Sequence, residues 1–213
     1  MTPEDACKFT DYICRLAPVI PVLVIEDATI AEPLAEALVS GGLPTLEVTL
    51  RSAAALDAIK AMSKVAGATV GAGTLLSGQD VRAAKEAGAV FGVSPGATDA
   101  LLQACEDIEM PLLPGAATAT EVMRLMERGY RMQKFFPAEA SGGPPALKSI
   151  GGPLPQVTFC PTGGIGVTNA ATYLQLSNTV CVGGSWVAPK SLVEKHDWQA
   201  IEALAQQASR MLD

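Results

Sequence analysis

Short apolar runs alternate with segments of helical periodicity along the whole chain. The runs cover residues 19–25, 45–50, 68–73, 90–94, 111–114, 132–136, 157–161 and 179–183. Landmark residues in successive runs lie 21 to 25 positions apart, which is the length of one strand followed by one helix. Nearly continuous apolar strands indicate a parallel sheet covered on both faces. Eight such units predict an α/β fold of the (β/α)8 TIM barrel type, because closure leaves no edge strand.

Helix signals fill the intervals between these runs. Thr118 and Glu121 form a capping-box pattern, and residues 198–211 are amphipathic. Residues 3–16 predict an extra N-terminal helix that covers the bottom of the barrel. An open, doubly wound sheet is the competing layout, since periodicity alone does not prove closure. The chain shows no linker and no shift in composition, so we expect residues 1–213 to form one domain.

The composition excludes some classes of protein. Of the 213 residues, 49% are hydrophobic and 17% are charged, which is ample for a core and excludes disorder. The net charge is −7 and the pI is near 4.8. Because binding to a phosphate backbone needs a basic face, we expect no nucleic-acid partner. An anionic ligand must instead be held by a few placed cations and backbone N–H groups.

Cysteine and histidine usage narrows the chemistry. The chain has an odd number of cysteines and no CxxC pattern, so we expect small buried hydrophobic residues in a reducing, cytoplasmic compartment: Cys7, Cys14, Cys105, Cys160 and Cys181. His196 is the only histidine, which excludes Ser-His-Asp triads and multi-histidine metal sites. We therefore expect no metal and no cofactor. No apolar run nears ~20 residues, so we expect no signal peptide and no membrane span.

Lys134 is the sharpest candidate for chemistry, as a lone cation inside an apolar strand. Strand alternation puts Met132, Lys134 and Phe136 on one face. If that face is the lumen, the amine lies at the mouth of the barrel among apolar walls. Desolvation disfavours an ammonium there, which makes a lysine nucleophilic toward a carbonyl. The alternative is a structural lysine that pairs or reaches solvent.

The second apolar run also carries polar side chains on one face. Alternation groups Glu47, Thr49 and Arg51, away from Leu46 and Val48. An inward carboxylate beside a lysine can act as a general acid/base, and Arg51 can form a fork onto a substrate carboxylate. The alternative is a Glu47–Arg51 ion pair inside the barrel.

Three glycine-rich segments lie at the ends of predicted strands. Residues 71–74 lack the third glycine of a dinucleotide fingerprint, so we expect close approach of a ligand, with Thr74 donating a hydrogen bond. Residues 162–166 and 183–186 follow the last two strands, where barrels often bind phosphate. With no Walker A pattern, such a phosphate belongs to a small substrate. Ordinary glycine turns are the alternative at all three places.

These motifs together resemble the 2-keto-3-deoxy-6-phosphogluconate (KDPG) aldolases, a class I pyruvate-aldolase family. The resemblance covers nearly the whole chain and rests on residues 46–51, 71–74, 94–96, 134–139, 159–165 and 183–186. It implies a Schiff-base aldolase that cleaves 2-dehydro-3-deoxy-6-phosphogluconate to pyruvate and glyceraldehyde 3-phosphate. It also implies cleavage of 4-hydroxy-2-oxoglutarate to pyruvate and glyoxylate, and a homotrimer.

The resemblance assigns roles to particular residues. Lys134 is implied as the Schiff-base lysine, and Glu47 as a proton shuttle that works through a water. Around the pyruvyl half it implies Arg51, Thr74, Pro95, Phe136 and Thr162. At the phosphate it implies Gly163, Gly164, Gly183, Gly184 and Ser185.

Three other functions stay open at this point. One is an aldolase for 2-dehydro-3-deoxy-6-phosphogalactonate, since the sequence does not give the preferred C4 stereochemistry. A phosphate-binding barrel isomerase or epimerase shares the glycine loops but needs no imine-forming lysine. A catalytically inactive barrel that only binds a phosphorylated ligand is disfavoured, because acid/base, carboxylate-binding and phosphate-binding candidates are all present.

Overall fold

The computed structural model describes residues 2–212, so residues 1 and 213 of the expected domain lie outside it. Its strands are β1 (Val19–Leu23), β2 (Thr45–Thr49), β3 (Thr69–Gly73), β4 (Phe91–Val93), β5 (Leu112–Leu113), β6 (Gly115–Ala116), β7 (Met132–Phe135), β8 (Thr158–Pro161) and β9 (Val182–Gly184). Its helices are α1 (Pro3–Cys14), η1 (Ala28–Ile30), α2 (Ala31–Ser40), α3 (Ala55–Met62), α4 (Gly78–Glu86), α5 (Asp99–Ile108), α6 (Ala119–Glu127), α7 (Gly143–Gly151), α8 (Ala170–Leu174), α9 (Lys190–Val193) and α10 (Trp198–Ser209).

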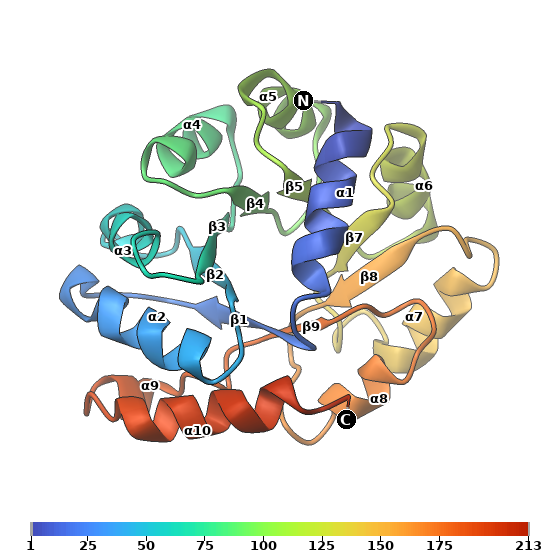
Figure 1. Ribbon diagram of the computed structural model, residues 1–213. Coiled ribbons are helices and arrows are strands. Elements are labelled where there is room, and N and C mark those ends of the chain that lie inside the picture. The colour runs from blue at the N-terminus through green and yellow to red at the C-terminus, as the bar shows by residue number, and fades with distance from the viewer. Residues whose placement is uncertain (1, 213) are drawn as a thin grey trace.

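The strands are all parallel and form a curled α/β arrangement with helices outside (Figure 1). One sheet has six strands in the order β5-β4-β3-β2-β1-β9, and a second has three in the order β6-β7-β8. The predicted α/β class and the parallel pairing are confirmed. The strands described in residues 2–212 form these two sheets rather than the single eight-stranded sheet that was predicted.

The predicted fifth strand is the place where the two sheets part. Its predicted bounds, residues 111–114, contain β5, which pairs with β4, and the chain continues beyond these bounds into β6, which pairs with β7. Pro114 lies between them, and proline has no N–H to donate to a ladder. Its carbonyl still accepts a hydrogen bond from the Lys134 N–H at 2.8 Å. The division therefore has a local cause in the sequence.

Side-chain alternation along the strands separates two apolar clusters. The larger cluster, which contains Leu46, Val48 and Phe135, packs beneath the helices. The smaller cluster lies on the inner face of the curl and contains strand residues such as Phe91 and Met132. Glu47 and Lys134 alternate with members of the outer cluster, and the strands therefore direct both side chains inward.

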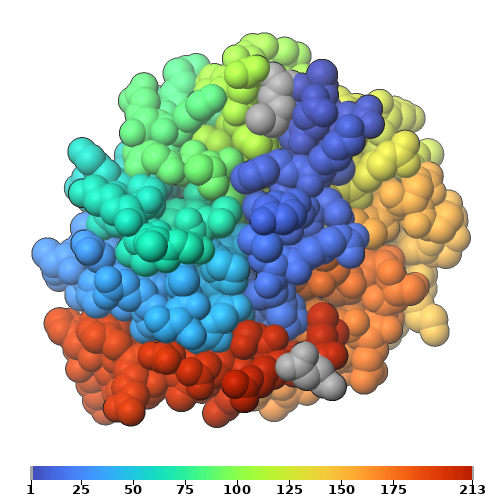
Figure 2. Space-filling view, viewed as in Figure 1, coloured from blue at the N-terminus to red at the C-terminus, as the bar shows by residue number. Residues whose placement is uncertain are grey.

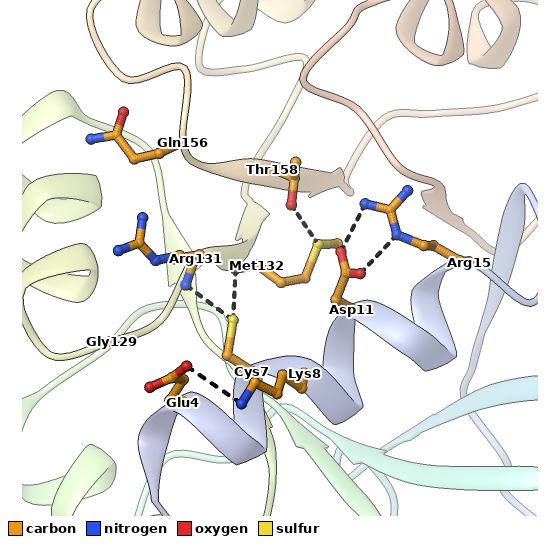
Figure 3. A pocket seen from close by; sticks show the side chains of 10 residues that line it. All are labelled: Glu4, Cys7, Lys8, Asp11, Arg15, Gly129, Arg131, Met132, Gln156 and Thr158. Carbon is orange, nitrogen blue, oxygen red and sulfur yellow. Dashed lines mark hydrogen bonds and ion pairs between the residues drawn. The ribbon is translucent and has the colours of Figure 1, made fainter.

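The predicted N-terminal helix is present as α1, and it lies across the amino ends of the strands (Figure 1). Its atoms fill the centre of that face in the space-filling view (Figure 2). The Thr45 hydroxyl, at the start of β2, donates to the Ile13 carbonyl at 2.9 Å. The Cys7 sulfur accepts from the N–H groups of Arg131 and Met132, at 3.2 and 3.3 Å (Figure 3). The five cysteines are buried as expected, and Cys7 is in addition a tether for the helix.

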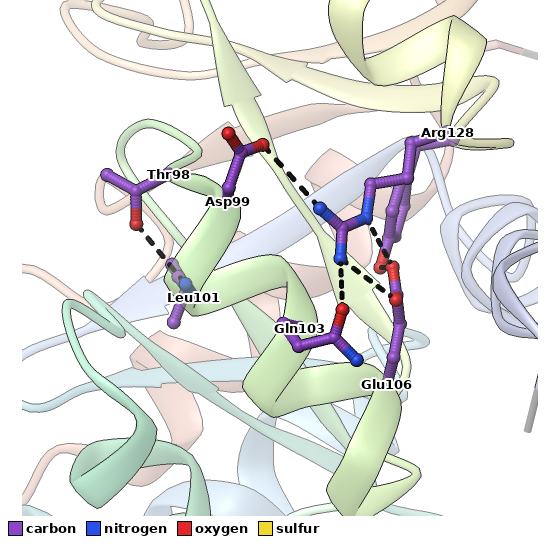
Figure 4. Close-up of polar contacts among 7 residues, drawn as sticks. Thr98, Asp99, Leu101, Gln103, Glu106 and Arg128 are labelled. Atoms are coloured by element: carbon purple, nitrogen blue, oxygen red, sulfur yellow. Dashed lines mark hydrogen bonds and ion pairs between the residues drawn. The ribbon is translucent and has the colours of Figure 1, made fainter.

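Polar contacts hold the outer helices. The predicted capping box at the start of α6 is confirmed, since Thr118 and Glu121 each bind the other's backbone N–H. Arg128 joins α5 to the turn after α6, with its Nε 2.8 Å from Glu106 Oε1 (Figure 4). Tyr130 donates to the same carboxylate at 3.2 Å. None of the helices within residues 2–212 has the length and apolarity needed to cross a bilayer.

Candidate active site

The structure brings together the two strongest candidates from distant parts of the chain. Lys134 Nζ lies 3.2 Å from Glu47 Oε1 and 3.5 Å from Oε2. Both side chains are buried, with 5% of Lys134 and 3% of Glu47 exposed. The buried ion pair joins β7 to β2, 87 residues apart in sequence. An amine and a carboxylate in direct contact can exchange a proton, so the pair supplies both a nucleophile and an acid/base.

Glycine at position 73 makes room for the carboxylate. A Cβ built on Gly73 would lie 2.2 Å from Glu47 Oε1 and 2.7 Å from Glu47 Cγ. Gly73 is paired with Thr49 on β2, two positions beyond Glu47, which is paired with Gly71. Any larger residue would displace Glu47 from Lys134. The sequence pattern indicated close approach at this segment, but it attributed that approach to a ligand.

Arg51 does not pair with Glu47, so that alternative is wrong. Glu47 makes its ion pair with Lys134, while Arg51 Nε donates to Thr49 Oγ1 at 3.2 Å. The Thr49 hydroxyl in turn donates to the Leu23 carbonyl at 2.9 Å. Arg51 itself is exposed just beyond the carboxyl end of β2. Its guanidinium is therefore at the strand edge where an anion can reach it.

Two more predicted residues lie at the same edge of the strands. Thr74 follows β3 with φ of 64°, a left-handed conformation that is strained for a β-branched residue. Strain of this kind costs about 1–3 kcal/mol and concentrates at functional positions. Pro95 follows β4, and its carbonyl oxygen lies 2.3 Å from where a Gly115 Cβ would be. Because Gly115 pairs with Lys134, this close approach holds Pro95 beside the lysine strand.

Phe136 connects the lysine to the first glycine turn. Lys134 Nζ lies 5.3 Å from the centroid of the Phe136 ring, within the range of a cation–π contact. A Cβ on Gly163 would lie 3.4 Å from Phe136 Cδ2. Gly163 and Gly164 both have positive φ, of 103° and 77°, which favours glycine. The aromatic ring thus lies between the amine and this turn.

The second glycine turn lies directly beside the first. Thr162 and Gly183 form a parallel bridge, and a Gly183 Cβ would lie 2.3 Å from Thr162 Oγ1. Gly184 lies against the Trp186 ring in the same way. Ser185 is exposed and lines a cavity of about 720 Å³ between β1, α2 and α9. The bridge thus places the two predicted phosphate loops side by side, whereas neither Glu47 nor Lys134 lines the cavity beside Ser185.

Glu139 contacts the first glycine turn, although the sequence pattern predicts no role for it. Its N–H donates to the Gly163 carbonyl at 3.1 Å, and its Cγ lies 2.7 Å from where a Gly164 Cβ would be. The Tyr173 hydroxyl donates a hydrogen bond to Glu139 Oε1. Only its place in the motif of residues 134–139 set this glutamate apart. Tyr173 carries no sequence signal of its own.

Within residues 2–212, no cluster of three or more His, Cys, Asp or Glu side chains is suited to hold a metal ion. The site has a different composition, in which one buried amine and one buried carboxylate lie at the carboxyl ends of parallel strands, beside glycine turns rich in backbone N–H groups. That arrangement defines a class of parallel α/β enzymes with active sites at this edge of the sheet.

Comparison with known proteins identifies the family within that class. The family model for KDPG and KHG aldolase matches residues 10–204, and the chain belongs to this aldolase family of carbon–carbon lyases. The 2-dehydro-3-deoxy-phosphogluconate aldolase of Pseudomonas aeruginosa is 48% identical over 206 residues, which is 96% of this chain and 94% of the relative.

Solved structures agree with this assignment. The KDPG aldolase of Zymomonas mobilis, solved with 3-phosphoglycerate, matches with a TM-score of 0.92 and 52% identity, over 96% of this chain and 97% of that one. The KDPG aldolase of Legionella pneumophila, with pyruvate captured as a covalent carbinolamine, matches with a TM-score of 0.90 and 44% identity, over 93% and 97% of the two chains.

Proposed function

We propose that this chain is a Schiff-base aldolase that cleaves 2-dehydro-3-deoxy-6-phosphogluconate to pyruvate and glyceraldehyde 3-phosphate. The buried contact between Lys134 and Glu47 carries the proposal, since it places a nucleophile beside its acid/base in an apolar site. The relative that captured pyruvate as a covalent carbinolamine supports the same chemistry.

The reaction begins with Lys134. Its uncharged amine attacks the C2 ketone, and Glu47, 3.2 Å from the nitrogen, moves protons between nitrogen and oxygen as the carbinolamine forms and loses water. The resulting iminium is an electron sink, a role for which metal-dependent aldolases use a divalent ion. The Phe136 ring faces the positive charge at this nitrogen.

Cleavage of the C3–C4 bond then uses Glu47 as a base. Glu47 takes the proton of the C4 hydroxyl through a water, the bond electrons pass into the iminium, and glyceraldehyde 3-phosphate leaves. The remaining enamine is protonated at its methylene carbon. Water hydrolyses the imine to release pyruvate and the free amine.

Other residues at this strand edge would bind the substrate. We assign Arg51 and Thr74 to the pyruvyl carboxylate, because both lie at the strand edge on the Glu47 side of the site. Pro95, Phe136 and Thr162 would line the pyruvyl pocket. For the phosphate we assign the two glycine turns with the exposed serine beside them: Gly163, Gly164, Gly183, Gly184 and Ser185.

A second substrate follows from the shared pyruvyl half. The family includes KHG aldolases, and 4-hydroxy-2-oxoglutarate presents the same C2 ketone and C4 hydroxyl. We propose that this chain also cleaves it, to pyruvate and glyoxylate. It lacks a phosphate, so its binding does not depend on the glycine turns.

Borohydride trapping tests the proposed chemistry. Incubation with pyruvate and borohydride should leave a reduced pyruvyl adduct on Lys134, because hydride reduces the imine to a stable secondary amine. Peptide mass spectrometry would locate the adduct. Exposed Lys148 is an internal control and should stay unmodified. An adduct on another lysine, or none, contradicts the proposal.

We further propose that the strands close into one eight-stranded barrel that forms a single domain. Parallel bridges Phe159–Thr179 and Thr162–Gly183 join β8 to the β9 segment, and β5 and β6 continue one another across Pro114. A crystal structure with β8 separated from Thr179 and Gly183 would contradict closure.

We also propose a cytoplasmic homotrimer. Five free, buried thiols support a reducing compartment, and the trimer rests on the resemblance to the family. Light scattering of the purified protein should give three times the chain mass of 22.0 kDa. A mass equal to that of one chain at micromolar concentration would reject the trimer.

A further inference from the structure

Glu139 is an exposed residue whose side chain lies against the first glycine turn. Its backbone N–H donates to the Gly163 carbonyl at 3.1 Å, and the N–H of the preceding Ala138 donates to the Thr162 carbonyl at 2.8 Å. Its side chain occupies the space beside Gly164, where a Cβ would lie 2.7 Å from Glu139 Cγ and 2.8 Å from Glu139 Cβ. The position of the turn therefore depends on where this side chain lies.

Tyr173 fixes the end of that side chain. Its ring is fully buried, and its hydroxyl donates to Glu139 Oε1. Burial and the neighbouring carboxylate raise the pKa of Tyr173, so the phenol stays protonated and remains a donor. Gly143 lies close to both groups, since its Cβ would be 3.5 Å from Glu139 Oε1 and 3.6 Å from the Tyr173 oxygen.

A second contact holds the far side of the same turn. The Asn169 side chain accepts from the Gly166 N–H at 2.8 Å and donates to the Gly164 carbonyl at 3.1 Å. The loop is thus held by Asn169, at the N-cap of α8, and by Glu139, in the turn that follows β7. Tyr173 lies within α8, and Asn169 is the N-cap residue just before this helix.

The position of Glu139 poses an electrostatic problem for an anion on this turn. A carboxylate in contact with Gly164 repels a phosphate bound there, unless its oxygens are directed elsewhere. The hydrogen bond from Tyr173 directs Oε1 toward α8 and stabilises the carboxylate there. Without it, the side chain is free to turn toward the phosphate.

We propose that Tyr173 and Glu139 are a positioning pair for the phosphate of the substrate, an inference that rests on the proposed aldolase function. The pair sets the geometry of the Gly163–Gly164 turn and keeps its own negative charge away from the bound anion. It thereby favours phosphorylated over unphosphorylated keto acids. Neither residue touches the reacting carbon atoms.

The substitution Tyr173→Phe removes the hydroxyl and keeps the buried ring. For 2-dehydro-3-deoxy-6-phosphogluconate we expect kcat/KM to fall about tenfold, mostly through KM, as for loss of one hydrogen bond to a charged group. For unphosphorylated 4-hydroxy-2-oxoglutarate we expect a change of less than about twofold. Pyruvate release, coupled to lactate dehydrogenase, measures both.

Two further variants separate charge from packing. Glu139→Gln keeps an oxygen that accepts from Tyr173 but removes the negative charge, so on the phosphorylated substrate its kcat/KM should fall less than that of Tyr173→Phe. The double variant Tyr173→Phe/Glu139→Gln should regain about threefold on the phosphorylated substrate, because the repelling charge is gone. Tyr130→Phe is the matched control, since it removes a buried hydroxyl that donates to Glu106 at 3.2 Å. It should leave unchanged the ratio of kcat/KM for the phosphorylated substrate to kcat/KM for the unphosphorylated one.

Equal loss on both substrates, or no loss on the phosphorylated one, would overturn the inference. Binding of inorganic phosphate, measured by calorimetry, gives a readout that does not need turnover. Tyr173→Phe should weaken it about tenfold. A wild-type protein that binds phosphate but does not cleave the sugar acid would refute the proposed aldolase function alone. Unchanged phosphate affinity in Tyr173→Phe would refute the positioning pair alone.

Discussion

Substitution of Lys134 by arginine should abolish aldol cleavage, with kcat at least about 10⁴-fold below wild type. Arginine preserves the positive charge and a partner for Glu47, so the buried carboxylate keeps its counterion. The guanidinium stays protonated in proteins and cannot attack a ketone. The coupled assay with lactate dehydrogenase measures the loss, and borohydride should trap no pyruvate on this variant.

Lys148→Arg is the control for this experiment. Lys148 is exposed on α7, and its substitution should leave kcat within about twofold. The far-UV circular dichroism of Lys134→Arg should match wild type, which shows that the buried site tolerates the larger side chain. A variant that retained even a hundredth of the wild-type turnover would show that no imine is needed, as expected of an isomerase or epimerase.

The sequence pattern predicts the direction of the site residues well because alternation is a local property. Leu46 and Val48 lie in the outer core, and Glu47 between them must face inward. By the same rule, Lys134 points to the inner face, because its neighbour Phe135 points into the outer core. Thus the sequence neighbours of a strand residue are enough to predict whether its side chain points inward or outward.

The partner of Glu47 could not be derived in this way. Arg51 lies four residues after Glu47, just beyond the end of β2, and the sequence favours an ion pair between them as much as a catalytic role for Glu47. The observed partner, Lys134, comes from β7, 87 residues later. Their contact depends on how far the sheet curls, and curling is a property of the whole set of strands.

The sequence pattern also does not predict which groups pack closely against a glycine. A glycine predicts conformational freedom or close approach, but it does not say what approaches. At Gly73 the neighbour is Glu47 itself, and at Gly164 it is Glu139. The break between β5 and β6 at Pro114 is the opposite case. There the sequence does carry a signal, the missing N–H of proline, but a count of apolar runs does not take it into account.

Glu47→Gln should lower kcat for cleavage by about 10²–10⁴-fold, the contribution typical of a positioned general acid/base. Glutamine has nearly the same shape, so it fits beside Gly73 and still offers an oxygen to Lys134 Nζ. Its amide does not accept a proton from the C4 hydroxyl at neutral pH. Because the amine itself is retained, borohydride should still trap pyruvate on Lys134, at a lower rate.

The combination of lost cleavage and retained trapping separates the two roles in the pair. Lys134→Arg removes both, since no imine forms, whereas Glu47→Gln removes mainly the proton transfers around it. Exposed Glu26, which lies 3.8 Å from Lys190, is the matched control, and Glu26→Gln should change neither readout. If Glu47→Gln cleaved the substrate at the wild-type rate, the carboxylate would be only a counterion for the lysine, and the base would have to be another group at the strand edge.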